Sequence, residues 1–165
     1  MSLIESLIAE PNPELALFGQ FVGDWDMDIE FYNEAGDTIY HGLGSWSFGW
    51  VLDGHVIQDV FKYPTQSGRG IGTTLRTYRP ERDEWQIVYL GAVTGAISIL
   101  HGGRRGQDIV LHGPDADGHN RWTFTDIHHD SFTWTGEISA DGTTYHVNHR
   151  MTGTRRASES THRAK

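Results

Sequence analysis

Hydrophobic and polar residues alternate with a period of two over most of this chain. The stretch 25–31 shows the pattern plainly, because Trp25, Met27, Ile29 and Phe31 are separated by acidic residues. This alternation is typical of a strand with one buried face and one face in water. About ten such strands, joined by short turns, are expected between residues 23 and 155. Such a meander predicts a closed up-and-down antiparallel barrel without exposed sheet edges, and a β-sandwich is the alternative.

The two ends of the chain show other patterns. Residues 1–22 carry apolar side chains at helical spacing, interrupted by Pro11 and Pro13. They predict a short N-terminal helical segment that caps the barrel. The barrel itself is expected over residues 23–155. Residues 156–165 are polar, and we expect a disordered tail there.

The barrel is expected to be organised around the hairpin at residues 44–63. Asp53-Gly54 separates two apolar runs, and this dipeptide suits a two-residue turn because both central positions need positive φ. Directly opposed residues share a face of the sheet. The opposed pairs are then Leu52 with His55, Trp50 with Ile57, Phe48 with Asp59, and Trp46 with Phe61. A histidine and a carboxylate among tryptophans on one face predict the wall of a ligand cavity.

The last two strands are expected to form a second hairpin of the same kind. Asp141-Gly142 provides its turn. This turn sets Trp134 opposite His149 and directs Tyr145 to the same face. His149 and Tyr145 are therefore expected inside the barrel.

Two middle turns bring further polar groups inward. A tight turn over Thr94-Gly95 sets Ile87 opposite His101, and a four-residue turn at 80–83 sets Arg76 opposite Ile87. Arg76 and His101 then flank Ile87 inside the barrel. The opposite phase of the strand at 71–79 is more apolar, so that alternative stays open.

These registers identify a candidate interior site. If the protein is an enzyme, we expect His55, Asp59 and His149 to be its acid–base groups. A single inward histidine is more often a satisfied core residue, but several polar groups among tryptophans favour a site. The residues expected to contact a ligand are Trp46, Phe48, Trp50, Arg76, Tyr89, His101, Trp122, Asp126, Trp134 and Tyr145.

The composition of the chain excludes several classes of function. The chain has 165 residues and a formal net charge of −9, which argues against a nucleic-acid partner because phosphates require a basic surface. It has no cysteine, so thiol nucleophiles and zinc–thiolate sites are excluded. No apolar run approaches the ~20 residues that span a bilayer, and the N-terminus lacks a basic region followed by an apolar run. We therefore expect no membrane partner and a cytoplasmic location.

We expect no metal site. His128-His129-Asp130 is rich in potential ligands, but neighbouring strand residues point to opposite faces. His146 and His149 are three positions apart, a spacing that suits a helix rather than a strand. A site assembled across strands from His55, His101 and His149 stays open.

The sequence Gly23-Asp24-Trp25 follows the expected helical segment and opens the first strand. It resembles the Gly-x-Trp opening of the lipocalin-like, or calycin, barrels. In those proteins an arginine near the end of the last strand packs over this tryptophan at the closed end. The resemblance implies that Arg155 stacks on the indole of Trp25, and the inward phase of the last strand also reaches Arg155.

A longer stretch resembles a family of bacterial lipocalin-like proteins of uncharacterised function. The resemblance covers roughly residues 15–155 and rests on GDWD, GSWSFGWVLDGHVIQDV, TTLRTYRPERDEW, VTGA, RWTFTDI, DSFTW and GE. It implies the fold and brings no agreed catalytic residues. Haem-binding nitrobindin-type barrels use one proximal histidine near the C-terminus, which would be His149, although YHVNHRMTG does not closely match that family's motif.

Two classes of function follow from these patterns. The first is a barrel that binds a small hydrophobic or aromatic molecule and needs no cofactor. The second is a cofactor-independent isomerase, cyclase or lyase whose cavity His, Asp and Tyr residues act as acid, base and hydrogen-bond donor. Haem binding in the nitrobindin manner is the further alternative. A homodimer is compatible with each of them.

Overall fold

The computed structural model of the protein describes residues 13–65, 68–115 and 118–157. The helical turn expected within residues 1–12 and most of the tail expected at 156–165 lie outside the described residues. The helices are η1 (Pro13–Leu15), α1 (Ala16–Gly19) and η2 (Pro80–Arg82). The strands are β1 (Gly23–Tyr32), β2 (Thr38–Val51), β3 (Val56–Thr65), β4 (Gly68–Arg79), β5 (Glu84–Gly91), β6 (Ile97–Arg105), β7 (Asp108–Asp115), β8 (Gly118–Thr125), β9 (Ser131–Ser139) and β10 (His146–Arg155).

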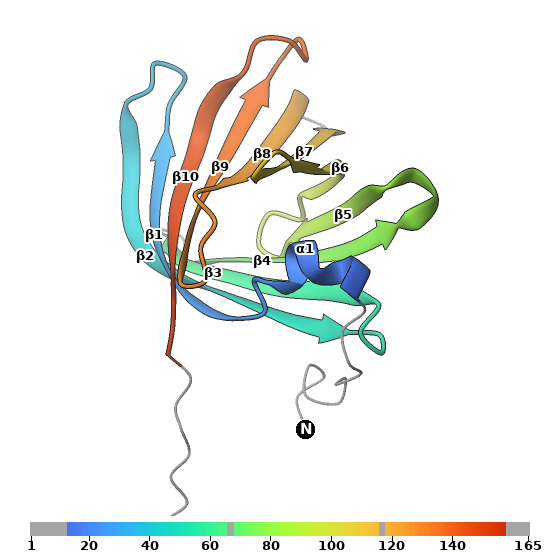
Figure 1. Cartoon of the computed structure of the whole chain (residues 1–165). Coiled ribbons are helices and arrows are strands. Elements are labelled where there is room, and N and C mark those ends of the chain that lie inside the picture. The colour runs from blue at the N-terminus through green and yellow to red at the C-terminus, as the bar shows by residue number, and fades with distance from the viewer. Residues whose placement is uncertain (1–12, 66–67, 116–117, 158–165) are drawn as a thin grey trace, which may run out of the picture.

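The strands form one closed antiparallel barrel. Each strand pairs with its neighbours along the chain, and β1 closes the ring by pairing with β10. The prediction of a closed up-and-down barrel is therefore confirmed, and the sandwich alternative is wrong. Figure 1 shows α1 at the lower end of the barrel, opposite the β1–β2 and β9–β10 turns at the top. Within the described residues no helix is long and apolar enough to cross a membrane.

The alternation in β1 explains how this strand sits in the wall. Trp25, Met27 and Ile29 are buried, whereas the acidic residues between them are exposed. The side chains of a strand point alternately to its two faces, so a period of two divides the strand into an inner and an outer face. The acidic residues thus form a solvated outer stripe, as the spacing predicts.

The end of the barrel at which β1 begins is filled by apolar side chains. The helical segment inserts Leu15, Phe18 and Phe21, all of which are buried. The Phe21 ring lies 5.0 Å from the rings of both Phe124 and Phe132, measured between centroids. We call this region the packed half; its core residues are Leu15, Phe18, Phe21, Trp25, Phe48, Trp85, Phe124 and Phe132.

At this same end of the barrel, Arg155 contacts both Trp25 and the backbone of neighbouring segments. Its guanidinium carbon lies 4.2 Å from the centroid of the Trp25 ring, and the two residues are opposed in the β1–β10 ladder. The guanidinium also donates hydrogen bonds to the backbone carbonyls of Gln20, Val22 and His129. The predicted stacking of Arg155 on Trp25 is confirmed, and it joins the helical segment, the first strand and the last strand.

Candidate functional site

A cavity of about 200 Å³ occupies the barrel interior on the side away from α1. Its lining comes from the strand ends remote from the helix, such as the end of β1 at Phe31 and the start of β10 at His149. We call this region the cavity half. The lining residues are Phe31, Trp46, Phe61, Tyr63, Thr74, Tyr89, Ser98, Asn120, Trp122, Trp134, Asn148, His149 and Met151.

Glycines in the wall explain why large rings do not fill this space. A Cβ atom on Gly72 would lie 2.6 Å from the ring of Tyr89, and a Cβ atom on Gly136 would lie 2.7 Å from the ring of Trp134. Both distances are shorter than van der Waals contact, so each ring lies directly against glycine backbone. The rings are therefore held against the wall, and the centre of the cavity half stays open.

His149 is a lining residue whose imidazole ring is buried among aromatic rings. Its ring stands edge-on to Phe31, with 4.3 Å between centroids, and its Nδ1 lies 3.2 Å from Oδ1 of Asn148. Burial lowers the pKa of His149 to about 4, because an apolar environment disfavours the charged imidazolium. The imidazole is thus neutral at pH 7.

The rest of the cavity lining is uncharged as well. Burial raises the pKa of Tyr63 and that of Tyr89, so both phenols keep their protons at neutral pH. Among the described residues that line the cavity there is no Asp, Glu, Lys or Arg. The described residues also contain no group of three or more His, Asp or Glu side chains that could hold a metal ion.

A buried ion pair lies beneath the cavity. The Arg76 guanidinium donates a hydrogen bond to Asp59, and each side chain is 1% exposed. The backbone N–H of Thr74 donates to the other carboxylate oxygen, at 2.9 Å. Burial raises the pKa of Asp59, and the charge of Arg76 works against that rise, as do the indole of Trp46 and the amide of Thr74. The indole Nε1 of Trp46 faces this carboxylate without making a hydrogen bond of ordinary geometry.

Arg76 belongs to the packed half rather than to the cavity. Its guanidinium carbon lies 5.1 Å from the centroid of the Phe18 ring and 5.2 Å from that of Phe48. Trp50 is also at this end, because its ring lies directly against Gly19 of α1. Asp59, Arg76, Phe48 and Trp50 therefore lie below the cavity, whereas the predicted residues that line it are Trp46, Tyr89, Trp122, Trp134 and His149.

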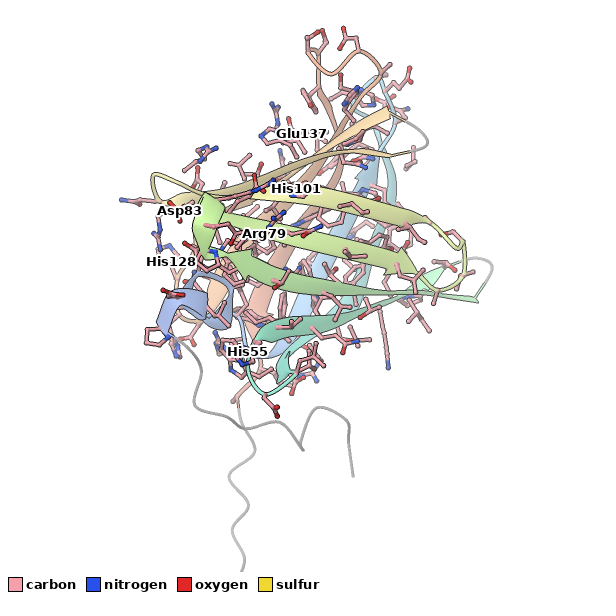
Figure 2. The ribbon with its side chains drawn as sticks, turned by 90° about the vertical axis from the view of Figure 1, so that its right-hand side faces the viewer. His55, Arg79, Asp83, His101, His128 and Glu137 are labelled. Carbon is pink, nitrogen blue, oxygen red and sulfur yellow. The ribbon has the colours of Figure 1, made fainter. Side chains whose placement is uncertain are left out.

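The expected inward position of His55 is wrong. The pairs Phe48–Asp59 and Trp46–Phe61 occur as predicted, but the ladder ends at Val51–Val56. Residues 52–55 form a four-residue turn in which Leu52 and Asp53 both have positive φ. His55 is consequently exposed in the turn at the end where α1 lies (Figure 2).

The expected inward position of His101 is also wrong. The β5–β6 connection is not a two-residue turn, because the Gly91 N–H bonds to the Ala96 carbonyl around a longer loop. Ile87 therefore faces Leu100, and His101 pairs with Gln86 on the outer face. A shift of one residue moves a side chain to the other face of the sheet. His101 lies on the outside of the wall, with its Nδ1 3.3 Å from a Glu84 carboxylate oxygen (Figure 2).

Tyr145 and Asp126 lie outside the cavity for a similar reason. The β9–β10 connection spans residues 140–145, so Tyr145 is in a loop, where its ring packs 4.1 Å from the guanidinium carbon of Arg121. Strand β8 ends at Thr125, and Asp126 follows it with a φ of 47° and an exposed side chain. Both inward expectations extended a strand by one residue beyond its bounds: β10 begins at His146, after Tyr145, and β8 ends before Asp126.

Sequence reasoning missed a group of small polar residues in the lining. Ser98 and Asn120 are in phase with the buried Leu100 and with Trp122. The alternation along these two strands therefore indicated that both residues face inward. No sequence pattern indicated an inward position for Asn148, because this residue lies in a register shift of the β9–β10 ladder. The longer β9–β10 connection and this shift each move the register by one residue, so His149 pairs with Gly136 instead of Trp134 and stays on the inner face.

Comparisons with solved structures identify the architecture. Rv2717c from M. tuberculosis superposes with a TM-score of 0.65 at 14% sequence identity, covering 90% of this chain and 100% of that one. The S-type phycobiliprotein lyase CPES from Guillardia theta superposes with a TM-score of 0.63 at 12% identity, covering 87% and 93%. The fold is a lipocalin-like barrel. The sequence matches no protein-family model and no curated protein.

Haem does not fit this lipocalin-like barrel as the cavity stands. The neutral imidazole of His149 is a suitable axial ligand in chemical terms. A cavity of about 200 Å³, however, is only slightly larger than the roughly 150 Å³ that holds one benzene molecule. A macrocycle of four pyrrole rings needs far more space than this cavity offers. The proposed function therefore does not include haem binding.

Proposed function

We propose that this lipocalin-like barrel binds a small aromatic or hydrophobic molecule in its cavity half. The observation that carries the proposal is a cavity of about 200 Å³ whose wall is largely aromatic, with uncharged polar side chains between the rings. Ligand sites have this composition, because apolar surface supplies affinity and isolated polar groups fix orientation. The volume is below the roughly 300–1,000 Å³ of sites for drug-sized ligands. The ligand is accordingly a molecule of one or two rings.

The test is binding of toluene and naphthalene, followed by calorimetry and by tryptophan fluorescence. Trp46, Trp122 and Trp134 line the cavity, so a bound ring is expected to change their emission. Two variants on strand β4 serve as the test and its control. Gly72→Val places a side chain under the Tyr89 ring and pushes that ring into the cavity, whereas Leu75→Val changes a residue that is 41% exposed on the outer face.

We expect wild type and Leu75→Val to bind at least one of the two probes and Gly72→Val to lose binding while it stays folded by circular dichroism. Binding that survives in Gly72→Val would place the ligand outside the cavity. A folded wild type that binds neither probe at millimolar concentration would overturn the proposal.

The cofactor-independent isomerase, cyclase or lyase stays a prediction and now depends on fewer residues. His55 is exposed and Asp59 is paired with Arg76, so neither is placed to act on a molecule in the cavity. His149 remains as a neutral base, with the Tyr63 and Tyr89 phenols as hydrogen-bond donors. Conversion of a bound molecule that stops in His149→Gln would favour this second function over simple binding.

The homodimer also stays a prediction, and the outer face of β4, β5 and β6 is the surface that supports it. The exposed aliphatic residues there are Leu75, Val88, Leu90, Ile97 and Ile99, and they oppose one another across the three strands. Two copies of a chain with a net charge of −9 repel, so they can approach best through an uncharged face. Sedimentation velocity on wild type, Leu90→Lys and the control Leu43→Lys on β2 tests this pairing.

A further inference from the structure

The chemistry of the ligand, which rests on the proposed function, is constrained in three ways by the cavity. Size is the first constraint. Since roughly 150 Å³ is enough for benzene, a cavity of about 200 Å³ is filled by a single ring with one or two small substituents, which narrows the proposed one or two rings to one. Rings already line the wall, and a planar ligand can meet them edge to face as Trp122 and Trp134 meet each other, with 5.6 Å between centroids.

Charge is the second constraint. The described lining residues include no ionised side chain, since His149 is neutral and the two tyrosines keep their protons. The buried carboxylate of Asp59 is already paired with Arg76. A charged ligand would lose its hydration without gaining a counter-ion, which is costly in an apolar site. The cavity therefore selects an uncharged molecule.

Hydrogen bonding is the third constraint, and His149 is the polar lining residue whose neighbour assigns the roles of its two ring nitrogens. Nδ1 of His149 faces the side-chain carbonyl oxygen of Asn148 at 3.2 Å. A carbonyl oxygen only accepts, so Nδ1 carries the proton and donates it to this bond. In a neutral imidazole the other nitrogen, Nε2, then presents a lone pair. His149 is thus prepared to accept a hydrogen bond from a molecule in the cavity rather than to donate one.

A second polar group in the same wall is unsatisfied. The indole Nε1 of Trp134 is buried and has no hydrogen-bond partner within the described structure, and the residue is 7% exposed. Buried donors are normally paired. An acceptor atom on a ligand near this ring would satisfy the donor, and a hydroxyl group can both accept and donate.

From these observations we infer that the natural ligand is an uncharged monocyclic aromatic molecule with a hydroxyl or N–H donor, held by a hydrogen bond to Nε2 of His149. Phenol is the simplest probe of this class. Toluene has nearly the same size and shape but no donor, and benzoate carries a charge.

The experiment measures the affinities of phenol, toluene and benzoate for three proteins by calorimetry at pH 7. The proteins are wild type, His149→Phe and the control His101→Phe, which changes the same residue type on the outer face. We expect the ratio of phenol to toluene affinity to fall about ten-fold in His149→Phe, because a donor then loses its buried acceptor. The ratio stays unchanged in His101→Phe, and benzoate binds more weakly than phenol to wild type.

The outcomes separate this inference from the proposed function. If toluene and phenol both bind and their ratio is the same in wild type and His149→Phe, the cavity binds ligands but the role of His149 is wrong. If benzoate binds more tightly than phenol, the inference of an uncharged ligand is wrong. If none of the three binds and the toluene and naphthalene test also fails, the proposed function itself is overturned.

Discussion

The packed half and the cavity half of this barrel are built from the same kinds of side chain, yet one is solid and the other is hollow. In the packed half, the Trp25 and Phe132 rings stand edge to face at 4.7 Å. In the cavity half, Tyr89 and Trp122 meet in the same way at 5.7 Å, but their neighbours leave about 200 Å³ open. Ring content alone therefore does not decide whether a barrel interior is filled.

The difference comes from what enters the barrel. About eight strands enclose a space that side chains from the wall can fill, and more strands enclose a wider one. This barrel has ten strands. In the packed half the additional space is taken by Phe18 and Phe21 from the helical segment. No described element enters the cavity half, and its rings lie against glycines of the wall.

The Asp59–Arg76 pair lies at the boundary between the halves, and removing one partner is expected to have the largest effect on stability. Arg76→Ala leaves a buried carboxylate without its counter-ion and removes the contacts of the guanidinium with Phe18 and Phe48. We expect the free energy of unfolding to fall by about 3–5 kcal/mol. Urea unfolding measures this change.

Two controls sharpen the Arg76 prediction. Arg79→Ala removes a partly exposed arginine that pairs with Glu81, and a loss below about 1 kcal/mol is expected there. The double variant Asp59→Leu with Arg76→Met removes both charges and should recover much of the loss. If Arg76→Ala is no more damaging than Arg79→Ala, the pair does not hold the boundary together.

One phenylalanine in each half tests the packing difference directly. Phe132 is 1% exposed among the rings of the packed half, whereas Phe61 borders the cavity. Truncation of a ring in a close-packed core costs about 3–5 kcal/mol, because a new cavity is left behind. Phe61→Ala only enlarges an existing space, so we expect a loss of about 1–2 kcal/mol. Equal losses in urea unfolding would mean that the cavity half is as tightly packed as the other.

The two halves also show which features of the fold and of the site could be predicted from the sequence. The meander of about ten alternating strands was enough to predict barrel closure. The contact of Arg155 with Trp25 was implied by the resemblance of Gly23-Asp24-Trp25 to the lipocalin-like barrels, and the inward phase of β10 agreed with it. The turn signals at 53–54 and 80–83 placed Asp59 and Arg76 on the inner face, because both strands run without a register shift from a correctly predicted pairing. The apolar pattern of residues 71–79 alone favoured the opposite phase for Arg76. Local periodicity and specific turns carried this information.

The failures have a different origin. His55, His101 and Tyr145 were misplaced because the lengths of their turns depend on backbone conformations that a dipeptide signal does not determine. An error of one residue reverses the face, as it did for His101. The cavity itself has no local signature, because it exists only where rings such as Tyr89 meet glycines on a neighbouring strand, as at Gly72. That contact joins residues from two strands.

The smallest expected effect concerns His149 and acid pH. Its pKa is lowered by burial to about 4 in the folded protein, against 6.5 for an ordinary histidine. As the pH falls below about 6.5, the unfolded chain binds a proton at this residue that the folded chain refuses until about pH 4. The contribution to stability is therefore intact above pH 6.5 and is lost progressively toward pH 4. His149→Gln removes the titrating group, so the stability of wild type relative to this variant should fall by about 1–2 kcal/mol between pH 7 and pH 5. Urea unfolding of both proteins across this range measures the difference, and Phe61→Ala should show a constant offset from wild type instead. A constant offset for His149→Gln as well would mean that the histidine is hydrated, and the cavity half would then be open to water rather than apolar.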